Sequence, residues 1–209
     1  MKNTESLIFD IDGTLWDSRA LVAEGYNIQL KKEGLEHLFV TAEDFKPLFG
    51  KVDWEIADVV FASVPQPERY ELLHRCMEGE WNYMQNHPCQ IGYPGVKETL
   101  EALAKTHRLF IVSNSQPGYP QLCIRKLGLE ALIAGTLCHG DTGLSKGRTI
   151  RVLMEKYGIT SCCYIGDTQM DYEATVEAGV PFVWASYGFG TPARFDARVD
   201  TFPQLTELF

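Results

Sequence analysis

Residues 7–15 read LIFDIDGTL, and this stretch decides how the chain is interpreted. An apolar run typical of a buried strand ends in the pattern Asp-x-Asp-Gly-Thr, which begins at Asp10. From average residue usage, this pattern arises by chance in roughly one chain of this length in 400. The structural alternative is that the aspartates only cap a turn.

Two carboxylates at this spacing suit phosphoryl transfer. Asp10 can attack phosphorus and form an acyl phosphate, which divides one difficult displacement into two easier ones. Asp12 points differently along an extended chain, so it can protonate the leaving alkoxide and then deprotonate the water that hydrolyses the intermediate. Gly13 lets the chain turn away, and we expect Thr14 to support that turn.

Beyond this stretch, short apolar runs alternate with amphipathic helical segments through the second half of the chain. The alternation predicts the α/β class, with a Rossmann-like, doubly wound parallel sheet flanked by helices. The expected strands are 6–9, 108–113, 135–138, 162–165 and 181–185. The expected helices are 96–105, 120–127, 147–157 and 171–178.

Residues 17–87 break this rhythm, because they contain successive helical patterns without a convincing strand. Thr41 and Asp44 indicate a capping box, and Pro67 opens the last of these helices. We therefore predict an inserted α-helical cap domain over 16–90 and a core made of 1–15 and 91–209. The glycines and proline of GYPG at 92–95 mark its expected return hinge.

A second group of polar residues follows the next expected strand, in LFIVSNS at 109–115. In open parallel sheets, ligands bind at the carboxyl ends of the strands, so Ser113 is expected to face the same crevice as Asp10. Its hydroxyl, with Asn114 behind it, could contact a phosphoryl oxygen. The alternative is an ordinary serine turn or helix cap.

Two further stations complete the pattern. Lys146, in GLSKGRTI, precedes an expected helix and can neutralise an aspartyl phosphate, although a lone lysine is usually a solvated charge. Gly166 and Asp167 end the fourth strand, and Asp171 follows at a helix start, where it could simply be a cap. Clustered carboxylates at strand ends suit Mg²⁺, which prefers carboxylate, water and phosphate oxygens.

Taken in order, these stations resemble the haloacid dehalogenase-like superfamily, whose pattern is D-x-D-G-T, Ser or Thr, Lys, then G-D-x-x-x-D. The segments YPGVKETLEAL at 93–103, EAGVP at 177–181 and SYGFG at 186–190 look like its phosphoglycolate phosphatase-like branch, which has a helical cap.

The resemblance implies the following roles. Asp10, the backbone carbonyl of Asp12 and Asp167 bind Mg²⁺, and Asp171 supports the metal site or Lys146. The phosphoryl group is held by Ser113, Asn114 and Lys146.

Within that superfamily, the aspartate at position 12 separates chemistries, because dehalogenases and ion-pumping ATPases lack it. We therefore predict a phosphatase acting on a small phosphorylated metabolite, such as phosphoglycolate, a sugar phosphate or a nucleoside monophosphate. One alternative is a phosphomutase like beta-phosphoglucomutase. A non-catalytic regulatory protein is another, but it would be expected to lose at least one catalytic residue.

Composition excludes other partners. The formal net charge is −9 and no basic stripe is present, which argues against nucleic acid. No run approaches the roughly 20 apolar residues that span a bilayer. The six cysteines form no zinc pattern. We expect a cytoplasmic monomer or dimer.

Substrate specificity is expected to lie in the helical insertion. Residues 45–51, FKPLFGK, place Lys46 and Lys51 beside two aromatic residues at a predicted helix junction. We select these two lysines as candidate substrate contacts. The alternative is an ordinary solvated loop, because surface lysines are common.

Overall fold

The computed structural model describes residues 4–51 and 53–209, and the chain divides into two compact units. The core unit combines Met1–Asp17 with Gln90–Phe209, and the helical unit is Ser18–Cys89. The stretch 92–95 lies inside the core unit, where the Tyr93 amide donates to the Leu15 carbonyl at 3.1 Å. The division between the two units falls between Cys89 and Gln90, and a return hinge at 92–95 stays a prediction.

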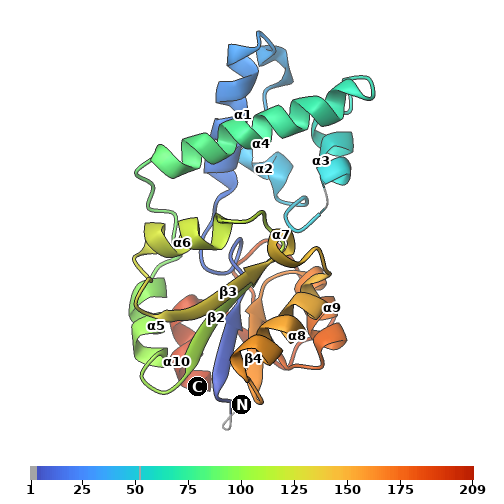
Figure 1. The fold of residues 1–209 in the computed structure, drawn as a ribbon. Coiled ribbons are helices and arrows are strands. Elements are labelled where there is room, and N and C mark those ends of the chain that lie inside the picture. The colour runs from blue at the N-terminus through green and yellow to red at the C-terminus, as the bar shows by residue number, and fades with distance from the viewer. Residues whose placement is uncertain (1–3, 52) are drawn as a thin grey trace. The chain divides into compact units, whose positions relative to one another are not determined.

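A parallel sheet of six strands forms the centre of the core unit, in the order β3-β2-β1-β4-β5-β6 (Figure 1). The strands are β1 (Ser6–Phe9), β2 (Arg108–Ser113), β3 (Ile133–Cys138), β4 (Cys162–Gly166), β5 (Phe182–Ala185) and β6 (Ala197–Val199). The first five strands were predicted from their apolar runs. The prediction missed β6, because it has only three residues and only Val199 among them is buried.

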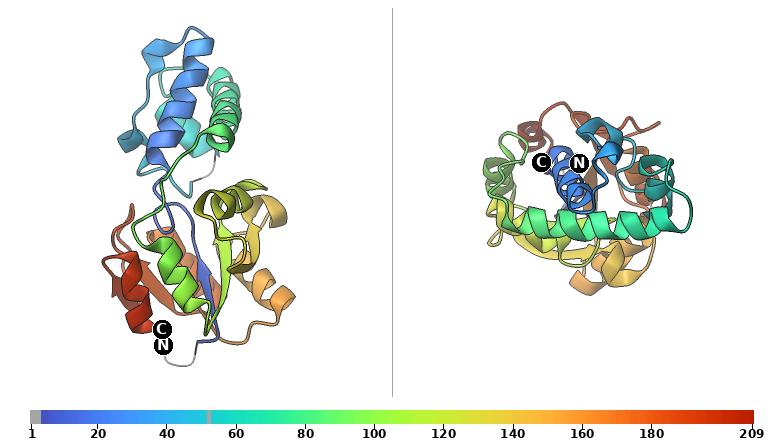
Figure 2. Two further views of the ribbon diagram at one scale, coloured as in Figure 1. Left: turned by 90° about the vertical axis from the view of Figure 1, so that its left-hand side faces the viewer. Right: turned by 90° about the horizontal axis from the view of Figure 1, so that it is seen from above.

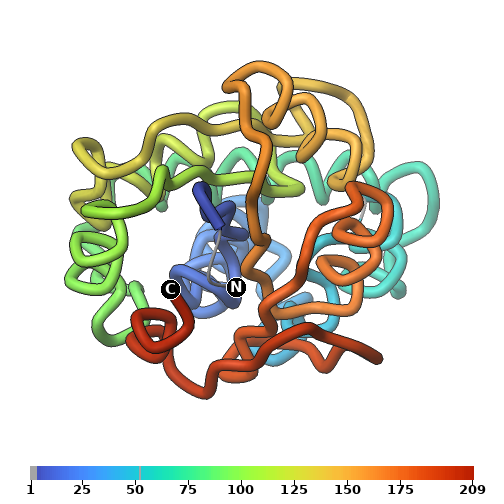
Figure 3. Tube along the Cα trace, turned by 90° about the horizontal axis from the view of Figure 1, so that it is seen from below, coloured from blue at the N-terminus to red at the C-terminus, as the bar shows by residue number. Residues whose placement is uncertain are grey.

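Helices cover both faces of this sheet, as expected for a doubly wound fold. They are α5 (Val96–Leu103), α6 (Tyr119–Leu127), α7 (His139–Thr142), α8 (Lys146–Tyr157), α9 (Gln169–Ala178), η2 (Phe202–Gln204) and α10 (Leu205–Leu208). Helices α5 and α10 pack together on one side of the sheet (Figure 3), and α8 and α9 pack against each other on the other (Figure 1).

Strand alternation explains the two faces. Ile8, Phe110 and Tyr164 are fully buried in one cluster with Ile150 and Leu153 of α8. On the opposite face the ring of Phe9 packs against that of Phe202, with centroids 5.9 Å apart. Successive strand residues point to opposite faces, so a strand covered on both sides must be apolar throughout.

The helical unit consists of α1 (Arg19–Lys32), η1 (Glu36–Leu38), α2 (Ala42–Phe45), α3 (Asp53–Val60) and α4 (Glu68–Asn86). Helices α1 and α4 lie side by side (Figure 2). Gly25 permits this contact, because a Cβ there would lie 2.6 Å from the Glu80 Cα. The predicted cap of α2 is confirmed, since the Thr41 amide donates to Asp44 Oδ2 at 2.7 Å.

The helices also bear on membrane insertion. Within the described parts of the chain, none is both long enough and apolar enough to span a bilayer.

Candidate active site

The site residues lie at the carboxyl edge of the sheet, because the strand register brings the carboxyl ends of neighbouring strands to the same level. Phe9 pairs with Ile111 on β2 and with Ile165 on β4, so the residues after β1 and β4 lie side by side. The chain runs from β1 to β2 and β3 on one side, and β4 to β6 lie on the other. Such a reversal of strand order is where doubly wound folds bind ligands.

Three buried carboxylates meet there. Asp10, Asp167 and Asp171 offer oxygens that all lie within 4.8 Å of one another. Lys146 Nζ lies 3.1 Å from Asp10 Oδ1 and 2.7 Å from Asp171 Oδ1. Among the described residues, these four are the buried charged side chains, so three carboxylates face one ammonium group.

Of the three carboxylates, Asp171 has the negative charge that the protein stabilises best. Its Oδ2 accepts hydrogen bonds from the Thr168 amide at 2.9 Å and the Thr168 hydroxyl at 2.7 Å, within a capping box that starts α9. Burial opposes ionisation, but attraction to Lys146 and these hydrogen bonds hold the pKa of Asp171 below its ordinary value. Asp171 therefore caps a helix and also orients the lysine.

The negative charges of Asp10 and Asp167 are stabilised less well. Burial raises the pKa of Asp10 to about 7, although Lys146 opposes the shift. Burial, followed by repulsion from Asp171 and Asp10, raises the pKa of Asp167 well above its ordinary value. Buried carboxylates whose ionised form is disfavoured in this way need a further cation to ionise together.

The donor set fits a hard divalent cation. Two under-compensated carboxylates on adjacent strand ends supply the oxygen ligands that Mg²⁺ prefers. Gly13 and Gly188 pack directly on Asp167, because a Cβ at either position would lie 2.2 and 2.4 Å, respectively, from the nearest Asp167 side-chain atom. Bulkier residues would crowd this carboxylate.

Asp12 is half-buried beside Asp10, and sequence reasoning missed the partners of its side chain. Asp12 Oδ1 accepts a hydrogen bond from Trp16 Nε1 at 2.8 Å and another from the Tyr119 hydroxyl at 2.7 Å. Nothing in the sequence pattern pointed to Tyr119, which is 107 residues away.

The Thr14 amide donates to the Ile11 carbonyl at 3.1 Å. Its hydroxyl also donates to Asp167 Oδ1, at 3.4 Å. The role of residues 186–190 was missed as well. In that loop the Phe189 amide donates to Asp167 Oδ2 at 2.7 Å, and the Tyr187 hydroxyl donates to the Thr14 carbonyl at 2.9 Å. The loop thus holds the Asp167 carboxylate, which directly follows β4.

Ser113 ends β2, on the strand that neighbours β1, and it is buried. Asn114 follows and is half-buried. The two candidate specificity lysines belong to the helical unit. Lys46 is exposed at the end of α2, and Lys51 forms an ion pair with Glu55 at 3.9 Å. Contact of either lysine with substrate stays a prediction.

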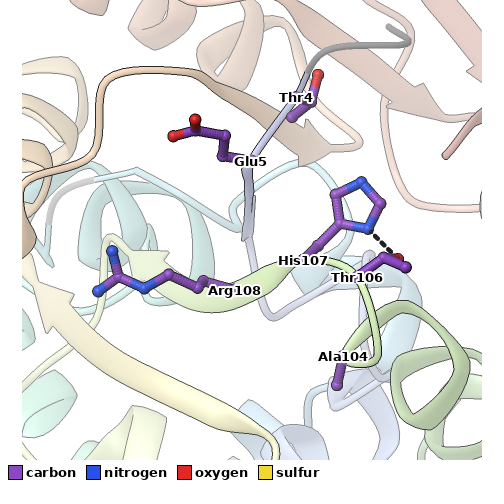
Figure 4. Close-up of a pocket in the computed structure, with 6 residues that line it drawn as sticks. All are labelled: Thr4, Glu5, Ala104, Thr106, His107 and Arg108. Carbon is purple, nitrogen blue, oxygen red and sulfur yellow. Dashed lines mark hydrogen bonds between the residues drawn. The ribbon is translucent and has the colours of Figure 1, made fainter.

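A surface pocket lies elsewhere on the core unit. Figure 4 shows His107 and Arg108, at the start of β2, beside Thr4 and Glu5, which precede β1. Its lining includes no residue of the predicted site. Because the lining residues lie at or before the starts of β1 and β2, the pocket is at the edge of the sheet opposite to the carboxylate cluster.

The chain is similar to known proteins over nearly its whole length. The chain is 27% identical to the phosphoglycolate phosphatase of Xanthomonas campestris pv. campestris over 220 residues, which cover 99% of this chain and 97% of that relative. It is 24% identical to a 5'-nucleotidase of Pseudomonas aeruginosa, over 94% of this chain and 89% of that protein.

Solved structures show the same fold. A predicted phosphoglycolate phosphatase from Haemophilus somnus superposes with a TM-score of 0.83 at 24% identity, over 98% of this chain and 97% of that one. A haloacid dehalogenase-like family protein from Streptococcus pneumoniae gives a TM-score of 0.85 at 19% identity, over the full length of both chains.

The family model described as "Haloacid dehalogenase-like hydrolase" matches residues 7–185. That match spans the whole of the carboxylate cluster, from Asp10 to Asp171. The chain belongs to the haloacid dehalogenase-like hydrolase family.

Proposed function

We propose that this protein is a magnesium-dependent phosphatase that hydrolyses a small phosphorylated metabolite through an aspartyl-phosphate intermediate on Asp10. The observation that carries the proposal is the geometry around that residue. Asp10 is buried, 3.1 Å from the Lys146 ammonium, and lies within 4.8 Å of Asp167 in the carboxylate cluster. Phosphoric monoester hydrolysis is also the activity named for the curated relatives described above.

The proposed reaction has two displacements. An Asp10 oxygen bonds to phosphorus while the ester P–O bond breaks, and the leaving oxygen takes a proton from Asp12. Asp12 then accepts a proton from water, whose oxygen bonds to phosphorus and releases phosphate and Asp10. Each displacement moves one proton through Asp12, so the residue returns to its starting state.

The remaining residues would bind the phosphoryl group and the metal ion. Lys146, Ser113 and Asn114 would hold the phosphoryl oxygens, with the lysine kept in place by Asp171 at 2.7 Å. Asp10, Asp167 and the Asp12 backbone carbonyl would hold Mg²⁺, which supplies positive charge to the phosphoryl group when bound. The surplus of buried carboxylates over ammonium groups supports this assignment.

Three substrate classes are open. The names of the relatives favour phosphoglycolate, and a nucleoside monophosphate is supported by the 5'-nucleotidase likeness. Sugar phosphates remain a third candidate. A cytoplasmic location and a monomeric or dimeric state stay predictions.

A panel assay tests the proposal. Purified protein is incubated with 2-phosphoglycolate, sugar phosphates and nucleoside 5'-monophosphates in the presence of Mg²⁺, and released phosphate is measured. We expect release from at least one compound and its loss on chelation, with Mg²⁺ restoring it better than Ca²⁺, which demands more ligands at longer distances. Undiminished release in excess chelator contradicts the metal requirement. Isomerisation of a hexose 1-phosphate without net phosphate release would indicate a phosphomutase instead.

A further inference from the structure

Two aromatic side chains contact the Asp12 carboxyl group, and both donate to the same oxygen. Trp16 Nε1 and the Tyr119 hydroxyl lie 2.8 and 2.7 Å from Asp12 Oδ1. Their rings also contact each other edge to face, with centroids 5.6 Å apart and an interplanar angle of 81°. The three side chains form one packed group within the core unit.

The turn after β1 brings Trp16 to this position. The Gly13 amide donates to the Trp16 carbonyl at 2.9 Å, and Gly13 has a φ of +82°, which a residue with a side chain rarely adopts. The chain therefore returns beside Asp12 within four residues. The Trp16 side chain is fully buried, so its indole cannot turn away from the carboxyl group without disrupting the core.

Tyr119 arrives from a different segment. It is the first residue of α6, directly after Gly118, which has a φ of +87°, and it is 7% exposed. Its hydroxyl reaches Asp12 from the start of that helix. Two buried aromatic side chains thus donate hydrogen bonds to one oxygen of the carboxyl group of Asp12, which is half-buried.

We propose that Tyr119 and Trp16 are positioning residues that hold the Asp12 carboxyl group in the orientation needed to pass a proton to the leaving oxygen. The inference rests on the phosphatase function proposed above. An oxygen that accepts two hydrogen bonds is a poor place for the transferable proton, so that proton is carried on Oδ2. Fixing Oδ1 therefore also fixes the direction in which the proton is presented.

This role predicts a dependence on the leaving group. An alkoxide needs a proton as the ester bond breaks, whereas p-nitrophenolate is stable enough to leave without one. For p-nitrophenyl phosphate, kcat/KM covers only the steps up to departure of the nitrophenolate. It should therefore be insensitive to the orientation of Asp12.

The test measures kcat/KM with Mg²⁺ for Tyr119→Phe and Trp16→Phe. One substrate is p-nitrophenyl phosphate. The other is whichever alkyl ester the wild type turns over fastest among 2-phosphoglycolate, glucose 6-phosphate and adenosine 5'-monophosphate. We expect Tyr119→Phe to lower kcat/KM about ten- to a hundredfold on the alkyl ester, a part of the 10²- to 10⁴-fold typical of general acid catalysis. The value for p-nitrophenyl phosphate should change less than about twofold.

Tyr157→Phe is the matched control. It also removes one hydroxyl from a core-unit helix, but Tyr157 lies by the start of β2, where its carbonyl accepts a hydrogen bond from Arg108. We expect it to change neither value. Circular dichroism and thermal unfolding verify that each variant is folded, so a folding failure of Trp16→Phe would leave Tyr119→Phe as the deciding variant.

A second arm uses Asp12→Asn. If Tyr119 acts through Asp12, adding Tyr119→Phe to Asp12→Asn should cost no further activity on the alkyl ester, because the group being positioned is already lost. Equal losses on both esters, unchanged values on both, or additive losses in the double variant would overturn the inference while the phosphatase assignment stands. A wild-type protein that hydrolyses none of these esters overturns the proposed function, and this inference with it.

Discussion

The two units of the molecule differ in whether they bury an ion pair. In the helical unit, Arg75 of α4 pairs with Glu33 at the end of α1 and with Glu68 of its own helix, at side-chain exposures of 22–56%. The core unit has exposed pairs too, such as Arg148 with Glu177. In the core unit, Lys146 and its two partners are at most 9% exposed. Burying charges is costly, so a cluster with three carboxylates and one ammonium group is poor design for stability alone.

This difference indicates which unit carries the candidate active site. Surface ion pairs contribute little and can be exchanged without much effect. A buried cluster with more carboxylates than cations, at the ligand-binding edge of a doubly wound sheet, is a candidate functional site, since burial shifts the pKa values that catalysis uses.

The largest effect should come from Asp10→Asn in the core unit. The amide preserves shape but cannot attack phosphorus, so turnover should fall by several powers of ten with the fold intact. Steady-state phosphate release and circular dichroism measure the two properties. Residual turnover above about a hundredth of the wild-type value would reject Asp10 as the nucleophile.

Removing one positive charge from each unit compares how much a buried and an exposed ion pair contribute to the free energy of unfolding. Lys146→Met should lower the free energy of unfolding by about 3–5 kcal/mol, because it leaves Asp10 and Asp171 buried without their cation. Arg75→Met should cost at most about 1 kcal/mol, since its side chain is 37% exposed and its pairs are screened by solvent. Urea unfolding at neutral pH gives both values. Losses of similar size would show that burial does not distinguish the units.

Metal binding should be linked to pH through Asp10. Its pKa is raised to about 7 in the folded protein from 3.8, so between these values the folded state holds a proton that the unfolded state has lost. Without metal, this contribution to stability is complete below the lower value and is lost as the pH rises through the higher one. Mg²⁺ binds the ionised carboxylate, so the stability that it adds to the folded protein should increase as the pH rises.

Thermal unfolding with and without Mg²⁺ measures this linkage. The increase in melting temperature on adding Mg²⁺ should be larger at about pH 7.5 than at about pH 5.5. In Asp10→Asn the part of this gain that comes from Asp10 should be lost, so the gain should be smaller than in the wild type, and the part that comes from Asp167, whose pKa is also raised by burial, should remain. Equal shifts at both pH values in the wild type would mean that Asp10 does not titrate with the metal.

The smallest effect is expected in the helical unit. Lys46→Ala should raise KM a few-fold for the best metabolite, with far less effect on p-nitrophenyl phosphate, because the generic ester has little for a specificity residue to contact. Lys51→Ala should have a weaker effect, since Lys51 is already paired with Glu55. Equal changes for both esters, or none, would direct the search for specificity residues elsewhere in this unit.

Much of the core was predictable because its signals are local. The predicted bounds of β1 and β2 agree with the structure, and α8 and α9 begin only one and two residues earlier than expected. The very short α7 was missed, as was β6, because four and three residues are too few for a periodic pattern.

Local sequence patterns were enough to predict the fold class, the family resemblance and the residues of the carboxylate cluster. Parallel strands end at one edge of a sheet, so polar residues that follow buried apolar runs must converge there. The hydrogen-bond partners of these carboxylates, in contrast, are set by tertiary contacts. The second donor to Asp12 comes from Tyr119, and Asp167 is held by an amide of residue 189. Such contacts depend on how distant segments pack, and packing partners leave no periodic or spaced signal in the chain.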